Sequence, residues 1–530
     1  MTTGGNGTAG SALRGLGTSG LAGRGQGPAA TLGSSISGGS GLSGGGTSGR
    51  RGPTTELPSG MLSAEQSGAL VIAGPQAAPS GISGGGTGNG IGLAGLSGPR
   101  STSVGRRSAG LPGSRPAGSI GRSAPSLPGG LSAGRIAIGA ASGGTGSRPT
   151  IAGSSEIAGL MRRAAPSLGA VNANASSAGF SMRRPDVRRE AAEKLGGNKE
   201  SEDAVERGLD WLARHQYAAG NWSIHSLNCG DECSGHGSFH SDTAATGLAL
   251  LAYFGAGYTH TSGEHQDVVR RGLAWLTSHQ KTDGDLFSDD SEFVWLYSHG
   301  MAAIALCEAY GMTGDESLRQ PAQKAIDFIV AAQHPEFGGW RYRPRFESDT
   351  SVSGWQLMAL KSGEMAGLNV PQSAYAGVTR WLNSVEEPST PGRFRYHPTK
   401  EASLAMTAEG LLMRQYLGAK RDNAALIAGA DYLRSRAPRL DERDAYYWYY
   451  ATQVMFHMQG DYWSDWNAKL RDLLIMGQLK DGHSAGSWNP SQPTSAKWGE
   501  AGGRHYLTCL NLLMLEVYYR HLPLYIELDR

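Results

Sequence analysis

Histidine and cysteine side chains gather in one short stretch of the chain. Their order is His225-x3-Cys229-x3-Cys233-x2-His236-x3-His240. Thiolates and imidazoles at such short spacings can complete the tetrahedral ligand shell of a zinc ion. We take Cys229, Cys233 and His236 as the candidate ligands. Two alternatives stay open, a disulfide between Cys229 and Cys233 and a pair of free thiols.

A second group of chemically capable residues lies at the starts of apolar segments. The candidate catalytic groups are Asp349, His299 and Tyr450. The candidate substrate contacts are Trp355, Tyr297, Tyr447, Arg504 and Tyr506. Such a set predicts acid–base chemistry by the carboxylate and the imidazole, next to aromatic faces that stabilise cationic character.

Each of these residues also has a structural interpretation. Aromatic and histidine side chains can fill a narrow core while bonding their polar atoms locally. Asp349 precedes Thr350 and fits the N-cap of a helix. The catalytic interpretation requires these residues to lie close together, whereas the structural one does not. We expect Asp349, His299 and Tyr450 to lie within about 10 to 15 Å of each other around one cavity mouth.

Two kinds of helical segment must position these residues. Amphipathic segments occur at 203–216, 266–280, 320–333, 373–384, 424–435 and 462–478. Segments that are apolar almost all round occur at 243–255, 297–310, 349–363, 403–417, 446–458 and 505–519. A helix that is apolar on every face must be buried on every face, so the second set forms an inner layer. Six outer and six inner helices predict an all-α fold, an (α/α)6 toroid.

A repeated pattern marks the ends of the outer segments. The first copy is Arg207-Gly208-x2-Trp211-Leu212-x3-Gln216-x3-Gly220-x-Trp222. Later copies contain Gln280, Gly284 and Leu286, then Gln333, Gly338 and Trp340, and finally Gln478, Gly486 and Trp488. We expect the glutamine to bind backbone groups at the helix end and the glycine to turn the chain.

These repeats resemble the QW repeats of squalene and oxidosqualene cyclases. The ring resembles the wider toroid superfamily that includes the β subunits of protein prenyltransferases, over about two thirds of the chain. The resemblance implies a central cavity that binds a small apolar or amphipathic molecule. The cyclase acid motif Asp-x-Asp-Asp-Thr is replaced here by Phe346-Glu347-Ser348-Asp349-Thr350. The zinc-binding Asp-x-Cys pair of prenyltransferases is replaced by Asp349-Thr350-Ser351.

Because both catalytic motifs are missing, the sequence leaves open whether the chain is an enzyme. A terpene cyclase-like lyase or isomerase, or a transferase, is the first function considered. A polysaccharide lyase or hydrolase on the same ring is the first alternative. A non-catalytic binding scaffold is the second.

The first part of the chain has a different composition. Residues 1–185 hold 47 of the 80 glycines, a single phenylalanine, 15 arginines and three glutamates, which gives a net charge of +12. The remainder carries 33 basic and 43 acidic residues, a net charge of −10. So few apolar side chains cannot offset the entropy of ordering, and we expect a disordered low-complexity basic tail over 1–188 and the toroid over 189–530. Deleting residues 1–185 is then expected to leave the melting temperature nearly unchanged.

Location and partners follow from the same composition. The N-terminus shows no basic region followed by an apolar run, and no apolar stretch approaches the roughly 20 residues that span a bilayer. Four cysteines fit a reducing compartment, so we expect a cytoplasmic protein. The tail arginines are scattered without aromatic residues between them, which does not favour nucleic acid as a partner. A small molecule is the expected ligand, and the pattern predicts no particular oligomeric state.

Overall fold

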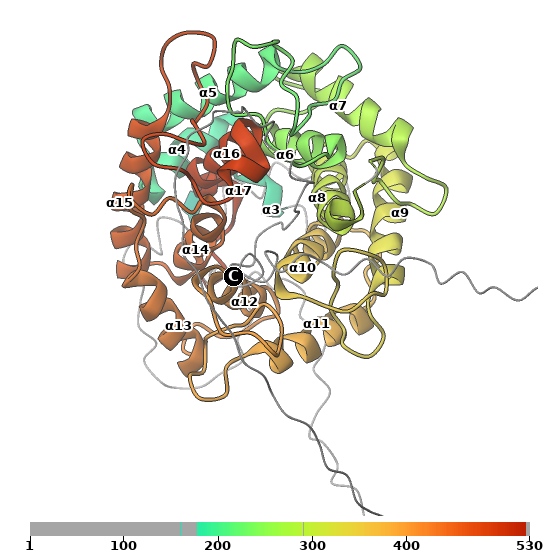
Figure 1. Cartoon of the computed structure of the whole chain (residues 1–530), viewed down its shortest axis with the longest axis vertical. Coiled ribbons are helices and arrows are strands. Elements are labelled where there is room, and N and C mark those ends of the chain that lie inside the picture. The colour runs from blue at the N-terminus through green and yellow to red at the C-terminus, as the bar shows by residue number, and fades with distance from the viewer. Residues whose placement is uncertain (1–158, 161–177, 290, 526–530) are drawn as a thin grey trace, which may run out of the picture. The chain divides into compact units, whose positions relative to one another are not determined.

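The computed structural model of the chain describes residues 159–160, 178–289 and 291–525, all within one compact unit. Most of the predicted tail lies outside these ranges. Six helical pairs follow one another in the described residues (Figure 1). The outer helices are α5 (Lys199–Arg214), α7 (Gln266–His279), α9 (Glu316–Ala332), α11 (Gln372–Val385), α13 (Ala424–Arg434) and α15 (Asp461–Gly477). The inner helices are α6 (Asp242–Gly255), α8 (Trp295–Thr313), α10 (Thr350–Met365), α12 (Leu404–Tyr416), α14 (Ala445–Met458) and α16 (Gly499–Leu515).

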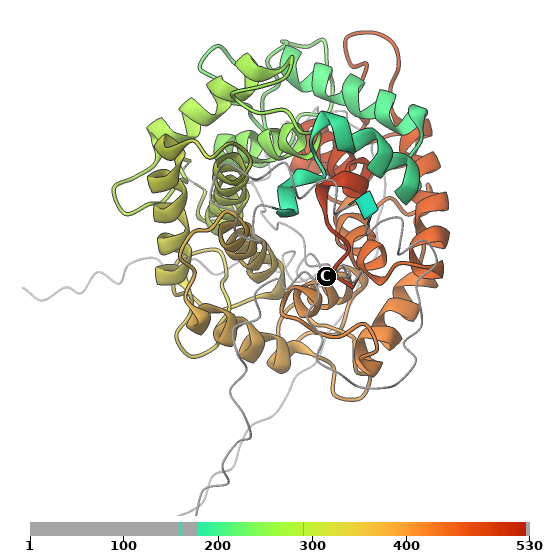
Figure 2. The ribbon, with the colours of Figure 1, turned by 180° about the vertical axis from the view of Figure 1, so that it is seen from behind.

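The inner helices form a closed ring. Each contacts the next in chain order from α6 to α16, and α16 returns to contact both α6 and α5. Figures 1 and 2 show this return from the two sides. The described residues contain isolated β-bridges but no strand. The predicted (α/α)6 toroid is therefore confirmed.

Burial separates the two layers as the hydrophobic pattern predicts. Every residue of α14 is buried, whereas α7 buries only five of its 14 residues. An inner helix touches two inner neighbours and the outer layer, and its remaining face meets side chains of other inner helices at the centre of the ring. None of the described helices combines the length and apolar composition needed to cross a bilayer.

The repeat glutamines tie neighbouring outer helices together. The Nε2 atom of Gln216 donates to the carbonyl of Gly220 at 2.8 Å and to the carbonyl of Val268, in α7, at 2.9 Å. Gln280 and Gln333 make the same two kinds of bond, one to their own loop glycine and one to the next outer helix. The expected bonding to backbone groups occurs, and it also links each repeat to its successor.

The last glutamine closes the outer layer. Gln478 donates to the carbonyl of Gly486 at 2.9 Å and to the carbonyl of Ala204, in α5, at 2.7 Å. Gly486 has φ +96°, and a Cβ on it would lie 2.0 Å from the carbonyl oxygen of Arg207. Only glycine allows the chain to run this close to the first outer helix.

The tryptophan of the repeat connects the two layers. Trp340 donates its indole N–H to the carbonyl of Ile329 at 2.8 Å, and its backbone N–H to the Ser353 hydroxyl of α10 at 2.9 Å. The backbone N–H groups of Trp222 and Trp488 likewise donate to threonine hydroxyls of inner helices.

The structure reveals a copy of the repeat that the sequence pattern missed. Phe394 takes the tryptophan position, and its backbone N–H donates to Thr407 of α12. Gly392 has φ +84°, and Glu386 replaces the glutamine and accepts from the Gly392 N–H at 3.0 Å.

The N-terminal boundary of the ordered chain is a correction. Residues 178–188 were assigned to the disordered tail, yet α3 (Ala178–Ser181) and α4 (Pro185–Leu195) pack on the ring. Figure 2 shows them on the same face as α17 (Val517–Arg520). Phe180 is 5 % exposed and Met182 is fully buried. Composition averaged over a long tail concealed this short apolar end.

A buried ionic cluster holds this segment in place. Arg183 donates from Nη1 to Glu308 Oε2 of α8 at 2.7 Å and from Nη2 to the carbonyl of Arg520 at 3.1 Å. Arg520 donates to the other oxygen of Glu308 at 2.8 Å. The side chains are 2 to 5 % exposed. We call this face of the ring, where the inner helices end, the floor.

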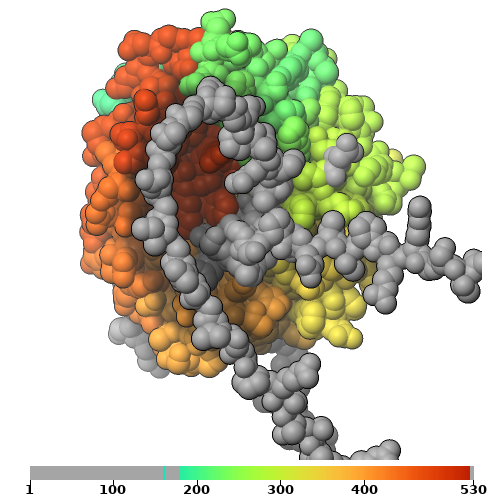
Figure 3. Space-filling view, viewed as in Figure 1, coloured from blue at the N-terminus to red at the C-terminus, as the bar shows by residue number. Residues whose placement is uncertain are grey.

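The opposite face, the mouth, is where the inner helices begin. It carries the long connections 215–241, 386–403 and 478–498, whereas connections at the floor are as short as 314–315 and 459–460. The surface at the mouth is hollowed toward the centre of the ring, where residues of the C-terminal part of the chain lie deep (Figure 3). Functional side chains are commonly carried on such long loops above a rigid scaffold.

Candidate functional site

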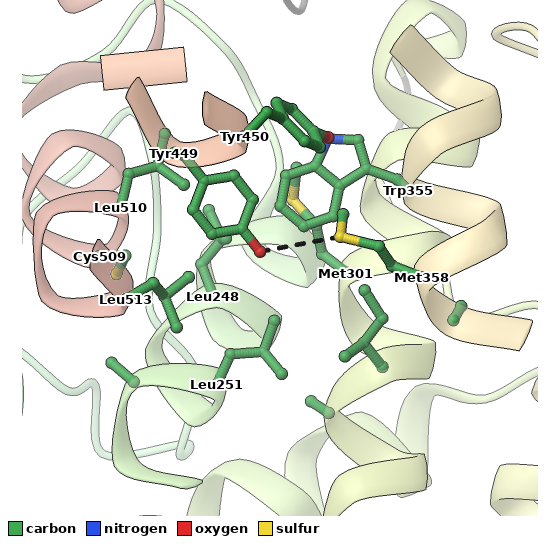
Figure 4. Packing of buried hydrophobic residues seen from close by; sticks show 14 of the residues in the cluster. Leu248, Leu251, Met301, Trp355, Met358, Tyr449, Tyr450, Cys509, Leu510 and Leu513 are labelled. Carbon is green, nitrogen blue, oxygen red and sulfur yellow. Dashed lines mark hydrogen bonds between the residues drawn. The ribbon is translucent and has the colours of Figure 1, made fainter. Parts of the chain in front are cut away.

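Aromatic and thioether side chains meet at the centre of the ring. Trp355 of α10 stacks on Tyr449 of α14, with ring centroids 5.8 Å apart and planes 10° from parallel. Tyr450 stands edge-on to the same indole at 6.2 Å. Met301 and Met358 lie beside these rings (Figure 4). The predicted residues Trp355 and Tyr450 therefore do come together.

A hydrogen-bonded relay crosses the ring next to these aromatics. Tyr297 of α8 donates to the Ser351 hydroxyl of α10 at 2.8 Å. Ser351 is bonded in turn to the hydroxyl of Tyr446 of α14, which donates to Glu409 of α12 at 3.2 Å. One line of side chains thus joins four inner helices.

Glu409 is the chemically most capable member of this relay. Burial raises the pKa of its carboxyl well above the usual value, and the hydrogen bond from Tyr446 offsets this only in part. A Cβ on Gly354 would lie 1.9 Å from Glu409 Oε1, so the carboxyl lies against the backbone of α10. Burial therefore favours the protonated, neutral form of this carboxyl.

Our sequence prediction did not include Glu409. A single carboxyl inside the apolar segment 403–417 was the available signal. Acidic residues are rarely fully buried, and a buried one has a function or a strong partner.

Replacing Glu409 with glutamine is expected to stabilise the protein relative to wild type increasingly as pH rises. The wild-type carboxyl stays protonated when folded but ionises near its ordinary value of 4.5 when unfolded. The folded state then holds the extra proton, so the wild-type free energy of unfolding falls by about 1.4 kcal/mol per pH unit up to the folded pKa. Chemical denaturation of both proteins at about pH 5 and about pH 8 measures this, with exposed Glu401→Gln as the control. An unchanged difference between the two pH values would contradict a neutral Glu409.

Two further polar atoms near this centre have no hydrogen-bond partner among the described residues. They are Trp355 Nε1 and the Tyr506 hydroxyl, on side chains that are 0 % and 5 % exposed. Burial raises the pKa of Tyr506 well above its usual value, and the carboxyls of Asp444 and Glu409 lie close enough to add to this rise. Buried donors of this kind usually find a partner in folded proteins.

Asp349 serves as the N-cap of α10. Its Oδ1 accepts from the backbone N–H of Val352 at 2.7 Å, and its Oδ2 lies 3.8 Å from Arg341 Nε. The helix-capping alternative is therefore realised. Burial is the main cause of the raised pKa of Tyr297 and of Glu409, and Asp349 lies close enough to the relay to add to both.

His299 does not join the other two predicted catalytic groups, which corrects the expected convergence. Its Nδ1 accepts from the backbone N–H of Leu286 at 3.1 Å, and its Nε2 donates to the carbonyl of Ala325, in α9, at 3.1 Å. The ring packs on Phe328, also in α9, at 4.6 Å. His299 thus faces the outer layer, in the repeat position where Ser353 bonds Trp340.

Tyr447 and Arg504 are also occupied by structural bonds. The Tyr447 hydroxyl donates to the carbonyl of Arg436 at 3.0 Å, behind the inner layer. Arg504 donates to the carbonyl of Ser234 at 2.7 Å and to the Ser487 hydroxyl at 2.9 Å. Of the five predicted substrate contacts, Trp355 and Tyr297 belong to the central cluster and Tyr506 lies near it.

The histidine–cysteine stretch forms a cluster with a different membership from the predicted one. Cys229 and Cys233 are free thiols. They meet His215 and His483, and the four potential ligand atoms all lie within 4.8 Å of one another. His236 is outside this cluster, since its Nδ1 accepts from the backbone N–H of Leu227 at 3.2 Å.

A crevice of about 290 Å³ lies elsewhere, on the outer wall between α13 and α15. Its charged residues include Arg434 and Asp465, which pair with each other at the surface. No inner-helix group contributes to it, and we place the candidate site at the ring centre.

Comparison with known proteins agrees with the fold. Residues 190–293 match the model of the squalene-hopene cyclase C-terminal domain. This range contains α5, α6 and α7 and the first two copies of the repeat. No curated protein matches the sequence.

Several solved structures are similar to this chain at low sequence identity. The GH76A alpha-1,6-mannanase from Salegentibacter sp. HEL1_6 is 10 % identical, with a TM-score of 0.44 over 60 % of this chain and 98 % of that one. The cellobiose 2-epimerase from Bacillus thermoamylovorans B4167 is 11 % identical, with a TM-score of 0.45 over 60 % and 98 %. The type II terpene cyclase MstE from Scytonema is 11 % identical, with a TM-score of 0.41 over 60 % and 97 %. The ring of paired helices makes the chain an α/α toroid, and its residues 190–293 are similar to the squalene-hopene cyclase C-terminal domain.

Proposed function

We propose that the protein binds an apolar or amphipathic small molecule at the centre of the ring, reached from the mouth, and that Glu409 donates a proton or hydrogen bond to it. The observation that carries this proposal is a fully buried carboxyl that accepts from Tyr446 beside the stacked rings of Trp355 and Tyr449, where burial favours its protonated form. In this role Glu409 replaces the two predicted catalytic groups. Asp349 caps a helix, and His299 bridges the two layers.

The surroundings of Glu409 suit the transfer of a proton to an electron-rich substrate. Desolvation favours the protonated acid, and the Tyr446 hydroxyl stabilises the carboxylate that remains after transfer by donating to it. Trp355 and Tyr449 present π faces that stabilise positive charge on the substrate. The Trp355 N–H and the Tyr506 hydroxyl are donors for a polar end group.

A non-catalytic scaffold is the second candidate function. The observation in its favour is the relay from Tyr297 through Ser351 and Tyr446 to Glu409, which braces four inner helices from within. In this alternative the relay determines how the inner helices pack, and partners bind to the outer surfaces of the protein.

Thermal denaturation with added probes separates these functions. We expect a polyprenyl alcohol such as farnesol to raise the melting temperature of the full chain, since a ligand at 100 times its dissociation constant adds about 2.7 kcal/mol. Trp355→Leu should abolish the shift, and the exposed-site control Glu401→Gln should retain it. Glu409→Gln should bind the probe but form no product detectable by mass spectrometry.

The outcomes discriminate among the three classes. No shift with farnesol, in a wild type that denatures cooperatively, would overturn the proposal and favour the scaffold. A shift with an acidic oligosaccharide in place of farnesol would favour the polysaccharide lyase or hydrolase.

A further inference from the structure

The four-residue cluster near the mouth has the geometry of a metal site. Cys233 Sγ lies 3.4 Å from His215 Nε2 and 3.4 Å from His483 Nδ1. A tetrahedral ion with bonds of about 2.3 Å to sulfur and 2.0 Å to nitrogen separates its ligand atoms by roughly 3.3 to 3.8 Å. These two sulfur–nitrogen distances fall in that range, and all four potential ligand atoms lie within 4.8 Å of one another.

Neighbouring groups hold His215 and Cys233 in orientations suited to binding a metal ion. His215 Nδ1 lies 2.6 Å from the carbonyl of Trp211, so it carries the proton and leaves the Nε2 lone pair facing Cys233. A backbone carbonyl that orients a histidine in this way is a common second layer of metal sites. The imidazole also stacks on Trp211 at 4.2 Å, which fixes its plane. Ser484 donates to Cys233 Sγ at 3.3 Å.

We infer that His215, Cys229, Cys233 and His483 bind one zinc ion, and that this ion joins the first and last helical pairs of the ring. Two thiolates and two imidazoles in a tetrahedron are a ligand set that zinc prefers. Four protein ligands leave no open position for a substrate, so the ion is structural and separate from the Glu409 centre.

The position of the ligands in the chain gives the ion its role. His215 ends α5, and both cysteines lie in the connection from α5 to α6. His483 lies in the connection from α15 to α16, 250 residues after Cys233. The ion therefore closes the ring at the mouth, close to where Gln478 closes the outer layer through Ala204. Arg504 supports the same junction by bonding Ser234 and Ser487.

Metal analysis of the full chain tests the inference. Protein purified without chelator is expected to contain about one equivalent of zinc per chain. Cys233→Ser and His483→Ala should each lose it, whereas His236→Ala should retain it. His236 is the matched control because it belongs to the same loop but lies outside the cluster.

A second measurement applies even where a ligand variant fails to fold. Wild-type protein stripped with a chelator should melt at a lower temperature and recover with added zinc chloride. Titration of the stripped protein with cobalt(II) should give thiolate charge-transfer bands and the visible bands of a tetrahedral ion. Wild-type protein without zinc and without these cobalt bands would overturn the inference. Loss of zinc in His236→Ala, with retention in His483→Ala, would also overturn it.

Discussion

Replacing Arg183 with alanine is expected to lower the free energy of unfolding by about 3 to 5 kcal/mol, the usual result of removing one partner from a buried ion pair. The substitution leaves the Glu308 carboxylate with Arg520 alone and removes the bond to the Arg520 carbonyl. Equilibrium denaturation with urea measures the loss.

The neighbouring residue provides the control. Arg184 pairs with Asp186 at the surface, where the two side chains are 39 % and 62 % exposed. Exposed pairs contribute about 1 kcal/mol or less, so Arg184→Ala should have little effect. Equal losses in the two variants would show that the Arg183 cluster does not hold the segment. For the same reason, deleting residues 1–185 should now destabilise the ring, contrary to the expectation from composition.

Replacing Trp340 with alanine is expected to cost about 3 to 5 kcal/mol, as for other large buried aromatic residues. The indole is 1 % exposed, and its N–H is bonded to the Ile329 carbonyl. Alanine would leave a cavity between the layers and an unpaired carbonyl at the end of α9.

Phe337 is the matched control for Trp340. It lies in the same connection and is 49 % exposed. Phe337→Ala should change the free energy of unfolding by less than about 0.5 kcal/mol. A cost below about 1 kcal/mol for Trp340→Ala would mean that the repeat tryptophan does not join the layers.

The fold was predictable because the same pattern of helical segments recurs along the sequence. Segments apolar on every face alternate with amphipathic ones, and burial in two layers is the arrangement that satisfies both. The repeat glutamine and tryptophan mark the same junction in several copies. The copy at Glu386 and Phe394 was missed because both marker residues are substituted there, while Gly392 keeps the backbone conformation.

The site was less predictable, because the start of a helix does not tell which side of the helix each residue faces. His299 follows Leu286 by 13 residues, as Ser353 follows Trp340. In both pairs the later side chain accepts the backbone N–H of the earlier residue, so this spacing would have identified His299 as a structural acceptor.

Long-range contacts account for the rest of the site. His483 is 250 residues from Cys233, and no local spacing relates them, whereas His236 is nearby in sequence but turned away. The sequence signal for Glu409 was a single carboxyl inside an apolar helix. Its raised pKa follows from burial by helices that are distant in the chain, which no local pattern shows.

The unequal connections of the ring have a consequence for how such a protein can diversify. The longest connections, 215–241, 386–403 and 478–498, start from an outer helix and end at the mouth, while the connections at the floor are no longer than 256–265. Insertions and substitutions at the mouth can alter ligand selectivity without disturbing helix packing, because loops tolerate changes that packed elements do not. The helical framework can therefore be inherited while the chemistry above it is replaced, which is how one architecture comes to serve unrelated reactions.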